Sequence, residues 1–318
     1  MDRENLRLLW WVIGICISAV IVIALFTFID IRAVFIDLLY SWKPPIVTAI
    51  ICSFFGNLVF AAFQWKAAYD QMGVRTSLGE HMFVKTAVYG LRAVPPIRHG
   101  GVGRSHYMSR AHGIPREKSH AAVVLVEWVN ALVMLVVAIL GLLMGGHVGW
   151  VLPLILAFGV ALVAGAQIRN ALVRGEHERG PKDNWWRSLK RYVQLTRVPA
   201  KSFWTLFFYG LLMLLCRILA AALVASALGI AVPWRTALTY YPVAILIAAV
   251  PVAYFGTGLR ELAFFATISG MGANETVLAM GILFSIVDQL PIIIPGFATM
   301  APFIFACRVE DWPSPRPR

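Results

Sequence analysis

Apolar residues in this chain come in long runs that are separated by short segments rich in lysine and arginine. A helix that crosses a bilayer needs about 20 consecutive apolar residues, because it rises about 1.5 Å per residue through a hydrocarbon core about 30 Å thick. The runs long enough to cross are Leu8 to Ile29, Pro45 to Trp65, Ser119 to Met144, Val148 to Ile168, Phe203 to Ile230 and Thr276 to Ala306. The pattern therefore predicts six membrane-spanning helices.

Two further apolar stretches, Glu80 to Pro96 and Ala237 to Gly270, are interrupted by proline, glycine and arginine. Each half of either stretch is too short to cross a bilayer alone, so we expect both to be re-entrant hairpins that return to the face they entered from. Irregular backbone at membrane depth is stable only where it is buried in protein or lines a wet cavity. These two hairpins are therefore where we expect the functional site.

The lysines and arginines between the runs predict how the helices are oriented. The segment 169–202 carries nine basic residues against three acids, which predicts a cytoplasmic loop. Counting outward from this loop places both termini and the stretch from Arg98 to Lys118 in the cytoplasm, and the charge-balanced segment from Asp30 to Lys43 outside. The part of the loop from Trp185 to Lys201 has one apolar helical face, which predicts an interfacial helix, with a solvated linker as the alternative.

Composition narrows the class of protein. Hydrophobic residues make up 59% of the chain and charged residues 14%, and the mean hydropathy is +0.74. A soluble chain needs about a quarter of its residues charged, so an ordinary soluble protein is excluded. The net charge of +12 lies in loops between apolar runs, which favours anionic lipid over nucleic acid as a partner. The four cysteines lie in apolar stretches without paired spacing, so we expect no disulfide, metal or cofactor.

A short motif occurs twice, in or beside each interrupted stretch. The pattern P-x4-G-x3-R is matched by Pro95, Gly100 and Arg104 in the first copy and by Pro251, Gly256 and Arg260 in the second. Each copy precedes a long apolar run that contains an acid, Glu127 in one and Asp288 in the other. Because the first copy enters from inside and the second from outside, the two units are expected to form an inverted repeat.

The predicted fold is an all-α polytopic membrane protein with about six full transmembrane helices plus two re-entrant hairpins arranged as an inverted repeat. Residues 1–318 form a single integral membrane domain. Within it, 66–144 is the first repeat unit, 169–202 is the basic cytoplasmic loop with its interfacial helix, and 203–306 is the second repeat unit.

These residues also resemble a known family. The first copy, V-P-P-I-R-H-G-G-V-G-R, is similar to the P-G-R-x-G-E-x-x-R signature of the transmembrane domain of lysylphosphatidylglycerol synthases. The second copy, V-P-V-A-Y-F-G-T-G-L-R, is similar to that domain's P-x-x-x-G-G-x-G-x-R-E signature. The likeness runs from about Trp65 to Phe305 and includes V-L-V-E-W after the first copy. Two positions differ, because Gly101 stands where the family has glutamate and Trp128 stands where it has arginine.

The resemblance implies a function. That domain also exists as a stand-alone family of flippase-like proteins, some of which are linked to polyprenyl-phosphate sugar or hopanoid pathways. We expect no aminoacyl-transferase domain after Phe305, because thirteen residues follow it in the sequence. The resemblance therefore leads us to expect lipid translocation without lysine transfer.

Charged residues inside the predicted membrane segments are the candidate site. A charge at mid-bilayer costs about 2.5 to 3.5 kcal/mol on insertion scales, so such residues should face one another or a cavity. Arg104 and Arg260 are expected to bind phosphate, because a guanidinium binds phosphate through two hydrogen bonds. The other residues expected at the hairpin tips or on the basic path to them are Arg92, Arg98, Pro95, Gly100, Pro251 and Gly256.

A second set of charged residues is expected to couple transport or to balance the arginines. Its members are Glu127, Glu261, Asp288 and Arg217. A carboxylate in a low-dielectric cavity can take up a proton and so offset the charge of a phosphate lipid. For Arg217 the simpler interpretation is an ion pair that fixes the register of its helix.

Catalytic motifs are weak in this sequence. The histidines near the first tip lack the spacing of metal ligands on one helix face, although they cluster: His99, His106, His112 and His120. The spacing Lys85-x6-Arg92 resembles the opening of a membrane lipid phosphatase signature, but Ala93 follows where that signature has proline. We therefore expect no enzyme, with a lipid phosphatase as a minor alternative.

Together these patterns predict a flippase-like transporter that moves an anionic phospholipid or a polyprenyl-phosphate-type carrier by alternating access. The expected location is a bacterial-type cytoplasmic membrane, crossed several times. The expected partners are the lipid and the membrane, with a homo-oligomer or a lipid-modifying enzyme as further candidates and no nucleic acid. The alternative is a non-transporting membrane scaffold for a lipid-modifying or glycosyl-transfer enzyme.

The predicted topology can be tested with single cysteines in a background that lacks the native ones. A cysteine near Met108 should react with a membrane-impermeant maleimide only from the cytoplasm, and one near Ala273 only from outside, because the hairpins enter from opposite faces. Right-side-out and inverted vesicles separate the two cases. Reaction of both positions from the same face would contradict the inverted repeat.

Overall fold

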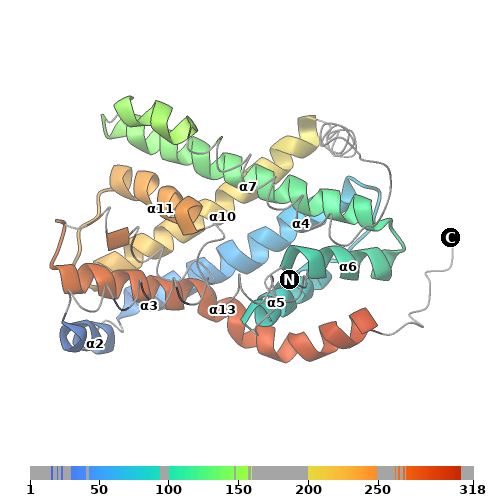
Figure 1. Cartoon of the computed structure of the whole chain (residues 1–318), viewed down its shortest axis with the longest axis horizontal. Helices are drawn as coiled ribbons and strands as arrows, with labels where there is room; N and C mark the ends of the chain where they lie inside the picture. Colours follow the sequence, from blue (N-terminus) through green and yellow to red (C-terminus); the bar gives the residue numbers. More distant parts are fainter. Residues whose placement is uncertain are drawn as a thin grey trace.

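The computed structural model describes residues 30–40, 43–93, 100–146, 148–156, 200–248 and 270–308, with isolated positions 16, 20, 23, 159, 262, 264, 265 and 268. Every regular element within these residues is helical, which confirms the predicted all-α class (Figure 1). In chain order the elements are α2 (Ile31–Tyr40), α3 (Pro44–Phe54), the π-helical turn η1 (Phe55–Phe60), α4 (Ala61–Asp70), α5 (Leu78–Ala93), α6 (Gly100–His112), α7 (Arg116–Met144), the 3-10 turn η2 (Val148–Trp150), α10 (Ala200–Ala227), α11 (Trp234–Ala248) and α13 (Asn274–Arg308).

Four helices are long and apolar enough to cross a membrane, namely Pro44–Asp70, Arg116–Met144, Ala200–Ala227 and Asn274–Cys307. The first is one continuous rod made of α3, η1 and α4, and the others are α7, α10 and α13. They coincide with four of the six predicted spans, so the chain is a multi-pass membrane protein. Most of the other two predicted spans, and nearly all of the segment 169–202, lie outside the described residues.

The ends of these helices are sorted into two groups. The end of α4, the start of α7, the start of α10 and the end of α13 lie on one side of the molecule, and the opposite ends of the same helices lie on the other (Figure 1). This alternation agrees with the loop charges, because the start of α7, the start of α10 and the end of α13 each adjoin a segment predicted to be cytoplasmic. We call that side the basic end and the other the opposite end.

Cationic side chains close the C-terminal ends of three spanning helices. Lys43 Nζ donates to the Ala227 carbonyl at the end of α10 at 3.0 Å, and Lys118 Nζ donates to the Met72 carbonyl just beyond α4 at 2.9 Å. Arg110 donates to a carbonyl in the last turn of α13 at 2.6 Å. A cation at a helix C-terminus satisfies an orphan carbonyl and opposes the negative end of the helix dipole. These bonds hold the helix ends in place at both sides of the bundle.

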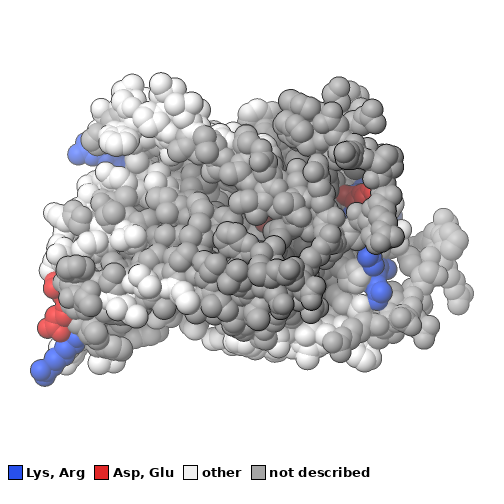
Figure 2. Space-filling model, in the orientation of Figure 1, with Lys and Arg blue, Asp and Glu red and all other residues white. Residues whose placement is uncertain are grey.

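The outer surface of the bundle is apolar. Large side chains such as Trp204, Ile294 and Phe305 are 63%, 63% and 71% exposed. The coloured lysine and arginine side chains visible on the face in Figure 2 lie toward its two ends. Exposed apolar side chains on spanning helices form a surface that a lipid bilayer solvates well.

The predicted bounds of the first hairpin, Glu80 to Pro96, are wrong, because Gly90 and Arg92 continue a single helix, α5. The chain folds back only beyond that helix, near the basic end, and returns as α6 through residues that were expected to form a cytoplasmic loop. We call this pair of helices the first hairpin. Its arms are α5 and α6, of 16 and 13 residues, which pack against each other on either side of residues 94–99 (Figure 1). The rings of Phe83 on α5 and Tyr107 on α6 have centroids 6.2 Å apart. The predicted tip, which includes Pro95 and Arg98, lies outside the described residues.

The second interrupted stretch also folds back, at the opposite end. Its first arm is α11, and Phe264, beyond the undescribed residues 249–261, returns to it with ring centroids 6.1 Å from Tyr241. This contact agrees with a fold-back in the second stretch, whose predicted tip lies outside the described residues. The two-fold relation between the units stays a prediction.

Each hairpin's first arm packs on the long helix of the other predicted unit. The arm α5 lies against α13, and the arm α11 lies against α7. Both contacts bring backbones together at glycine: a Cβ on Gly90 would lie 2.6 Å from the Gly296 carbonyl carbon, and one on Gly141 would lie 2.6 Å from the Thr239 nitrogen. Small residues permit this close helix packing in membranes, where interhelical contact and hydrogen bonds replace the hydrophobic effect. A two-fold relation between the units would place the first arm of each hairpin against the long helix of the other unit in this way. We call this arrangement the exchange of arms.

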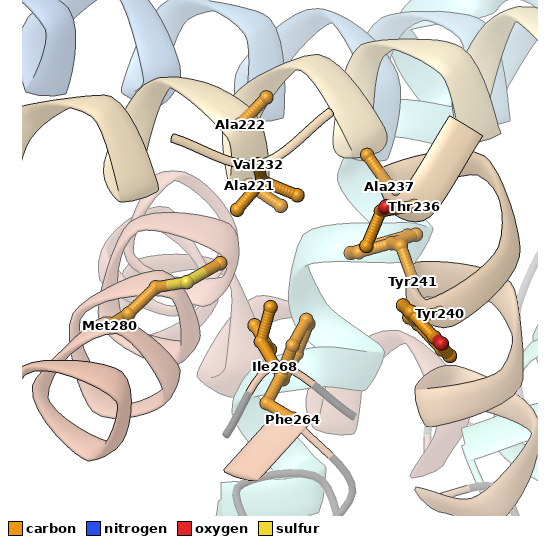
Figure 3. Close-up of a pocket in the computed structure, with 10 residues that line it drawn as sticks. All are labelled: Ala221, Ala222, Val232, Thr236, Ala237, Tyr240, Tyr241, Phe264, Ile268 and Met280. Atoms are coloured by element: carbon orange, nitrogen blue, oxygen red, sulfur yellow. The ribbon is translucent and has the colours of Figure 1, made fainter. Parts of the chain in front are cut away.

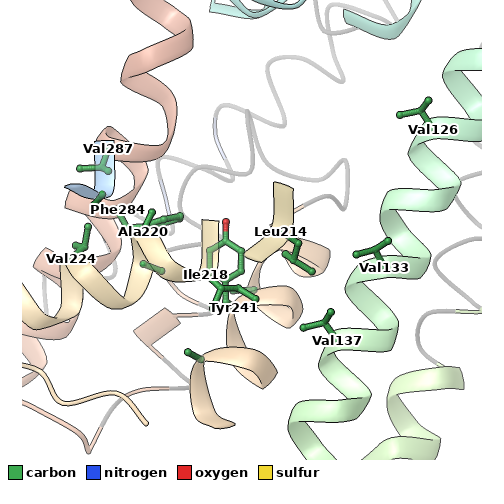
Figure 4. Packing of buried hydrophobic residues seen from close by; sticks show 14 of the residues in the cluster. Val126, Val133, Val137, Leu214, Ile218, Ala220, Val224, Tyr241, Phe284 and Val287 are labelled. Carbon is green, nitrogen blue, oxygen red and sulfur yellow. The ribbon is translucent and has the colours of Figure 1, made fainter. Parts of the chain in front are cut away.

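One buried apolar cluster extends from α3, α4, α5 and α6 to α7, α10, α11 and α13. In Figure 4 Val126, Val133 and Val137 point from α7 toward the side occupied by Leu214 and Tyr241. The valines recur on one helical face at spacings of seven and four residues. All five side chains are buried, so the core is continuous across the two predicted units.

Replacing Gly90 by alanine should destabilise the protein, because the new methyl group would overlap the backbone of α13. We expect the melting temperature of the detergent-purified protein to fall, with a loss of about 1 to 3 kcal/mol typical of overpacking. Gly79→Ala is the matched control on the same helix, since a Cβ there meets nothing within 4 Å. That variant should be neutral or slightly stabilised, because alanine favours helix over glycine. Equal melting temperatures for both variants would contradict the close packing of α5 on α13.

Candidate functional site

A charged cluster lies at the centre of the bundle. Arg217 on α10 binds Asp288 on α13 through two hydrogen bonds, from Nε to Oδ1 at 3.0 Å and from one terminal nitrogen to Oδ2 at 2.6 Å. The two side chains are 14% and 3% exposed. A bidentate pair fixes geometry as well as charge, which a buried ion pair needs in order to offset its desolvation.

Asn57 completes this cluster from the first spanning helix. Its Nδ2 donates to Asp288 Oδ1 at 2.7 Å and to the Asp288 backbone carbonyl at 3.1 Å. Asn57 lies in the π-helical turn η1, a form often found at functional sites because it re-aims side chains. Its neighbour Gly56 lets η1 approach α10, since a Cβ there would lie 2.9 Å from Cys216 Cβ. Three helices are therefore joined by one carboxylate.

Aromatic rings accompany the cluster. The Arg217 guanidinium lies 5.9 Å from the ring centroid of Tyr241 on α11. Tyr241 also lines a small apolar cavity between α10, α11 and α13 (Figure 3). The lining residues are Ala221, Ala222, Val232, Thr236, Ala237, Tyr240, Tyr241, Phe264, Ile268 and Met280. Tyr241 therefore lies beside both the central ion pair and this apolar cavity.

A second buried cluster lies in the first hairpin. Arg104 on α6 is 3% exposed, and its guanidinium carbon lies 4.1 Å from the ring centroid of Trp65 on α4. A cation over a tryptophan ring is attracted by the ring quadrupole, more strongly when both are desolvated. Next to it, Tyr69 and Ser119 share a hydrogen bond between their hydroxyls at 3.0 Å, and Ser119 donates to the Ser105 carbonyl at 3.0 Å.

His81 on α5 closes this cluster toward the basic end. Its ring stacks on Tyr69 with centroids 5.5 Å apart, and its Nε2 is 2.8 Å from the Thr76 hydroxyl. Burial, reinforced by the nearby Arg104, lowers the pKa of His81 to about 3. The imidazole is therefore neutral at physiological pH and adds no charge to the hairpin. Farther out, His112 Nε2 lies 2.7 Å from Glu80 Oε1 and ties α6 to α5.

The structure brings some of the predicted site residues together and leaves others apart. It brings Arg217 and Asp288 together and buries Arg104, whereas Glu127 is exposed on α7 and forms no ion pair with a described residue. Arg92 and Gly100 belong to the helices on either side of the first tip. The remaining predicted residues, which lie outside the described part of the chain, are Pro95, Arg98, Pro251, Gly256, Arg260 and Glu261.

Several contributors to these clusters were missed by sequence reasoning, among them Asn57, Trp65 and Tyr241. Asn57 carried a signal, because an amide inside an apolar span is costly unless it has a partner. Trp65 and Tyr241 carried none that distinguishes them from other aromatic residues in a membrane helix. Among the described residues, no group of three or more histidines, cysteines or acids could hold a metal ion.

The fold and the buried charges define an all-helical, multi-pass membrane protein with polar residues held between its helices. The sequence profile of the lysylphosphatidylglycerol synthase TM region matches residues 11–296. The chain therefore belongs to that family, and the resemblance noted from the two motifs is confirmed. A search among curated proteins finds no match to the chain.

Removing one partner of the central ion pair should be strongly destabilising. In Asp288→Asn the buried Arg217 loses its counter-charge, which typically costs about 3 to 5 kcal/mol. We expect a marked fall in melting temperature that the double variant Arg217→Met, Asp288→Leu largely reverses, since well-packed apolar residues can replace a buried pair. Asp70→Asn, which breaks the exposed pair between Lys66 and Asp70, is the control and should change little. A double variant less stable than Asp288→Asn would contradict a mainly structural role for the pair.

Proposed function

We propose that this protein is a flippase-like transporter that moves a phosphate-bearing lipid across the membrane by alternating access. The observation that carries this proposal is the burial of Arg104 against Trp65, directly beyond the tip of a hairpin in a membrane domain. A guanidinium held at that depth can receive a phosphate through two hydrogen bonds. The bacterial-type cytoplasmic membrane, with cytoplasmic termini, is the location we propose.

Family membership supports a lipid substrate. The family is named for a synthase of lysylphosphatidylglycerol, a lipid whose headgroup contains a phosphate. We transfer only that chemistry to this chain: a membrane lipid with phosphate in its headgroup, either an anionic phospholipid or a polyprenyl-phosphate-type carrier.

The packing of the helices supports alternating access. Each hairpin's first arm is fastened by glycine contacts to the long helix of the other predicted unit, while the first spanning helix and α10 meet at the central cluster. The two predicted repeat units, which exchange arms around a polar centre, can rock against each other. Inverted-repeat transporters expose a midplane site to one side of the membrane and then to the other by such a motion. In this scheme Arg217, Asp288 and Asn57 form the pivot.

We expect Arg104→Ala to abolish movement of a fluorescent anionic phospholipid in proteoliposomes, because the phosphate loses its buried guanidinium. Arg104→Lys should recover only part of the rate, since an ammonium cannot form the planar two-bond contact. Arg116→Ala, an exposed arginine at the start of α7, is the matched control and should transport normally. Lipid movement is followed by dithionite quenching of the probe, and all variants must remain monodisperse.

Two outcomes would count against this proposal. Normal transport by Arg104→Ala would remove Arg104 from the site. A wild-type protein that binds phosphate lipids but moves none would instead favour the alternative of a non-transporting membrane scaffold.

A further inference from the structure

A second buried cation accompanies Arg104 in the first hairpin. Lys85 on α5 is only 8% exposed, and its Nζ lies 5.7 Å from the ring centroid of Tyr89, one turn further along the same helix. Lys85 drew notice in the sequence only as part of an incomplete phosphatase motif. A buried lysine in a membrane protein is costly and marks a functional position more often than a structural one.

The pairing of α4 with α5 places Lys85 at the level of Arg104. These helices are joined by a short turn and pack against each other, and Tyr69 on α4 stacks on His81 on α5. Helices joined by a short turn run in opposite directions, so the residue one turn before Tyr69 on α4 is level with the residue one turn after His81 on α5. These two residues are Trp65 and Lys85. Arg104 stacks on Trp65. Phe83 on α5 packs on Tyr107 on α6, and a Cβ on Gly103 would lie 3.8 Å from Val88, so Lys85 and Arg104 both lie between these two contacts of the hairpin arms.

Three cations with little exposure each lie near an aromatic ring. The pairs are Arg104 with Trp65, Lys85 with Tyr89, and Arg217 with Tyr241. Along α5, Lys85 lies four residues, or about 6 Å, from His81 on one side and from Tyr89 on the other.

The charge balance of the first hairpin is strongly positive. From Leu78 to His112 the sequence holds five lysines and arginines but a single acid, Glu80, which is bound by His112 at the outer end. The corresponding stretch from Trp234 to Ala273 holds Arg235, Arg260 and Glu261 and is nearly neutral. The first hairpin therefore has the stronger attraction for an anionic headgroup.

We infer that Lys85 is a second headgroup-binding residue beside Arg104, and that the first hairpin selects lipids whose headgroup is a phosphate monoester. A monoester carries about −1.5 to −2 charges at neutral pH, whereas a phosphodiester headgroup contributes one negative charge. Two buried cations match the monoester, with Arg104 supplying the planar fork and Lys85 a point charge. This inference rests on the proposed function and narrows its substrate to lipid monophosphates, the class that includes polyprenyl-phosphate-type carriers.

The test compares two probes with identical acyl chains, phosphatidic acid as the monoester and phosphatidylglycerol as the diester. Wild-type protein should bind and move phosphatidic acid in preference to phosphatidylglycerol. Lys85→Gln should lower the movement and affinity of phosphatidic acid roughly 10-fold or more, as expected for losing a hydrogen bond to a charged group, and those of phosphatidylglycerol by less than about 3-fold. Lys85→Arg should retain the preference.

Two further variants keep the result interpretable. Lys85→Met preserves the length of the side chain and removes a buried charge, so it should fold at least as well as wild type and still lose the preference. Lys66→Gln removes a lysine that is 34% exposed and paired with Asp70, and it should leave both probes unaffected. Melting temperatures accompany each measurement.

Binding is measured by native mass spectrometry separately from transport, so the two proposals can fail independently. Selective loss of phosphatidic acid in Lys85→Gln and Lys85→Met supports the inference. An equal change for both lipids, or no change for either, overturns it and leaves the transport proposal standing. If wild-type protein moves neither lipid, the proposed transport fails, while the ratio of the two affinities still decides the role of Lys85.

Discussion

The bidentate contact between Arg217 and Asp288 sets the register of the helices that meet at the centre. Inside an apolar bundle an unpaired charge costs several kcal/mol, so α10 and α13 are stable only in the register that brings these two residues together. Asn57 adds the first spanning helix to the same carboxylate, and the π-helical turn supplies the angle that this requires. One carboxylate therefore sets the relative positions of three helices that apolar packing alone would leave free to slide.

Around that centre the hairpins are held by close packing of helix backbones at glycine residues. Gly90 and Gly296 let α5 and α13 touch backbone to backbone, and Gly141 does the same for α7 and α11. Lipid solvates apolar side chains as well as protein does, so close packing and interhelical hydrogen bonds are what hold membrane helices together. Because the arms are exchanged between the predicted units, any movement of one hairpin is transmitted to the other unit's long helix.

The chemistry of the site follows from how buried cations are accommodated. Each of Arg104, Lys85 and Arg217 lies near an aromatic ring, which attracts the cation through its quadrupole while presenting an apolar face to its neighbours. In the proposed mechanism Arg217, which is paired with Asp288, stabilises the helix packing, and the first hairpin binds the substrate.

The sequence by itself determined the class of protein, because runs of about 20 apolar residues and basic loops are local properties that each span must satisfy alone. The all-helical fold and four of the spans were readable in this way, and the two motifs indicated the family. The pairing of charges was not readable, because Glu127 and Asp288 are equivalent in the sequence repeat, yet one is exposed and the other binds Arg217. Only the tertiary structure decided which charges meet, where the chain folds back in the first hairpin, and that Trp65 lies against Arg104, because contacts between distant helices depend on their rotation and depth, which hydropathy does not encode.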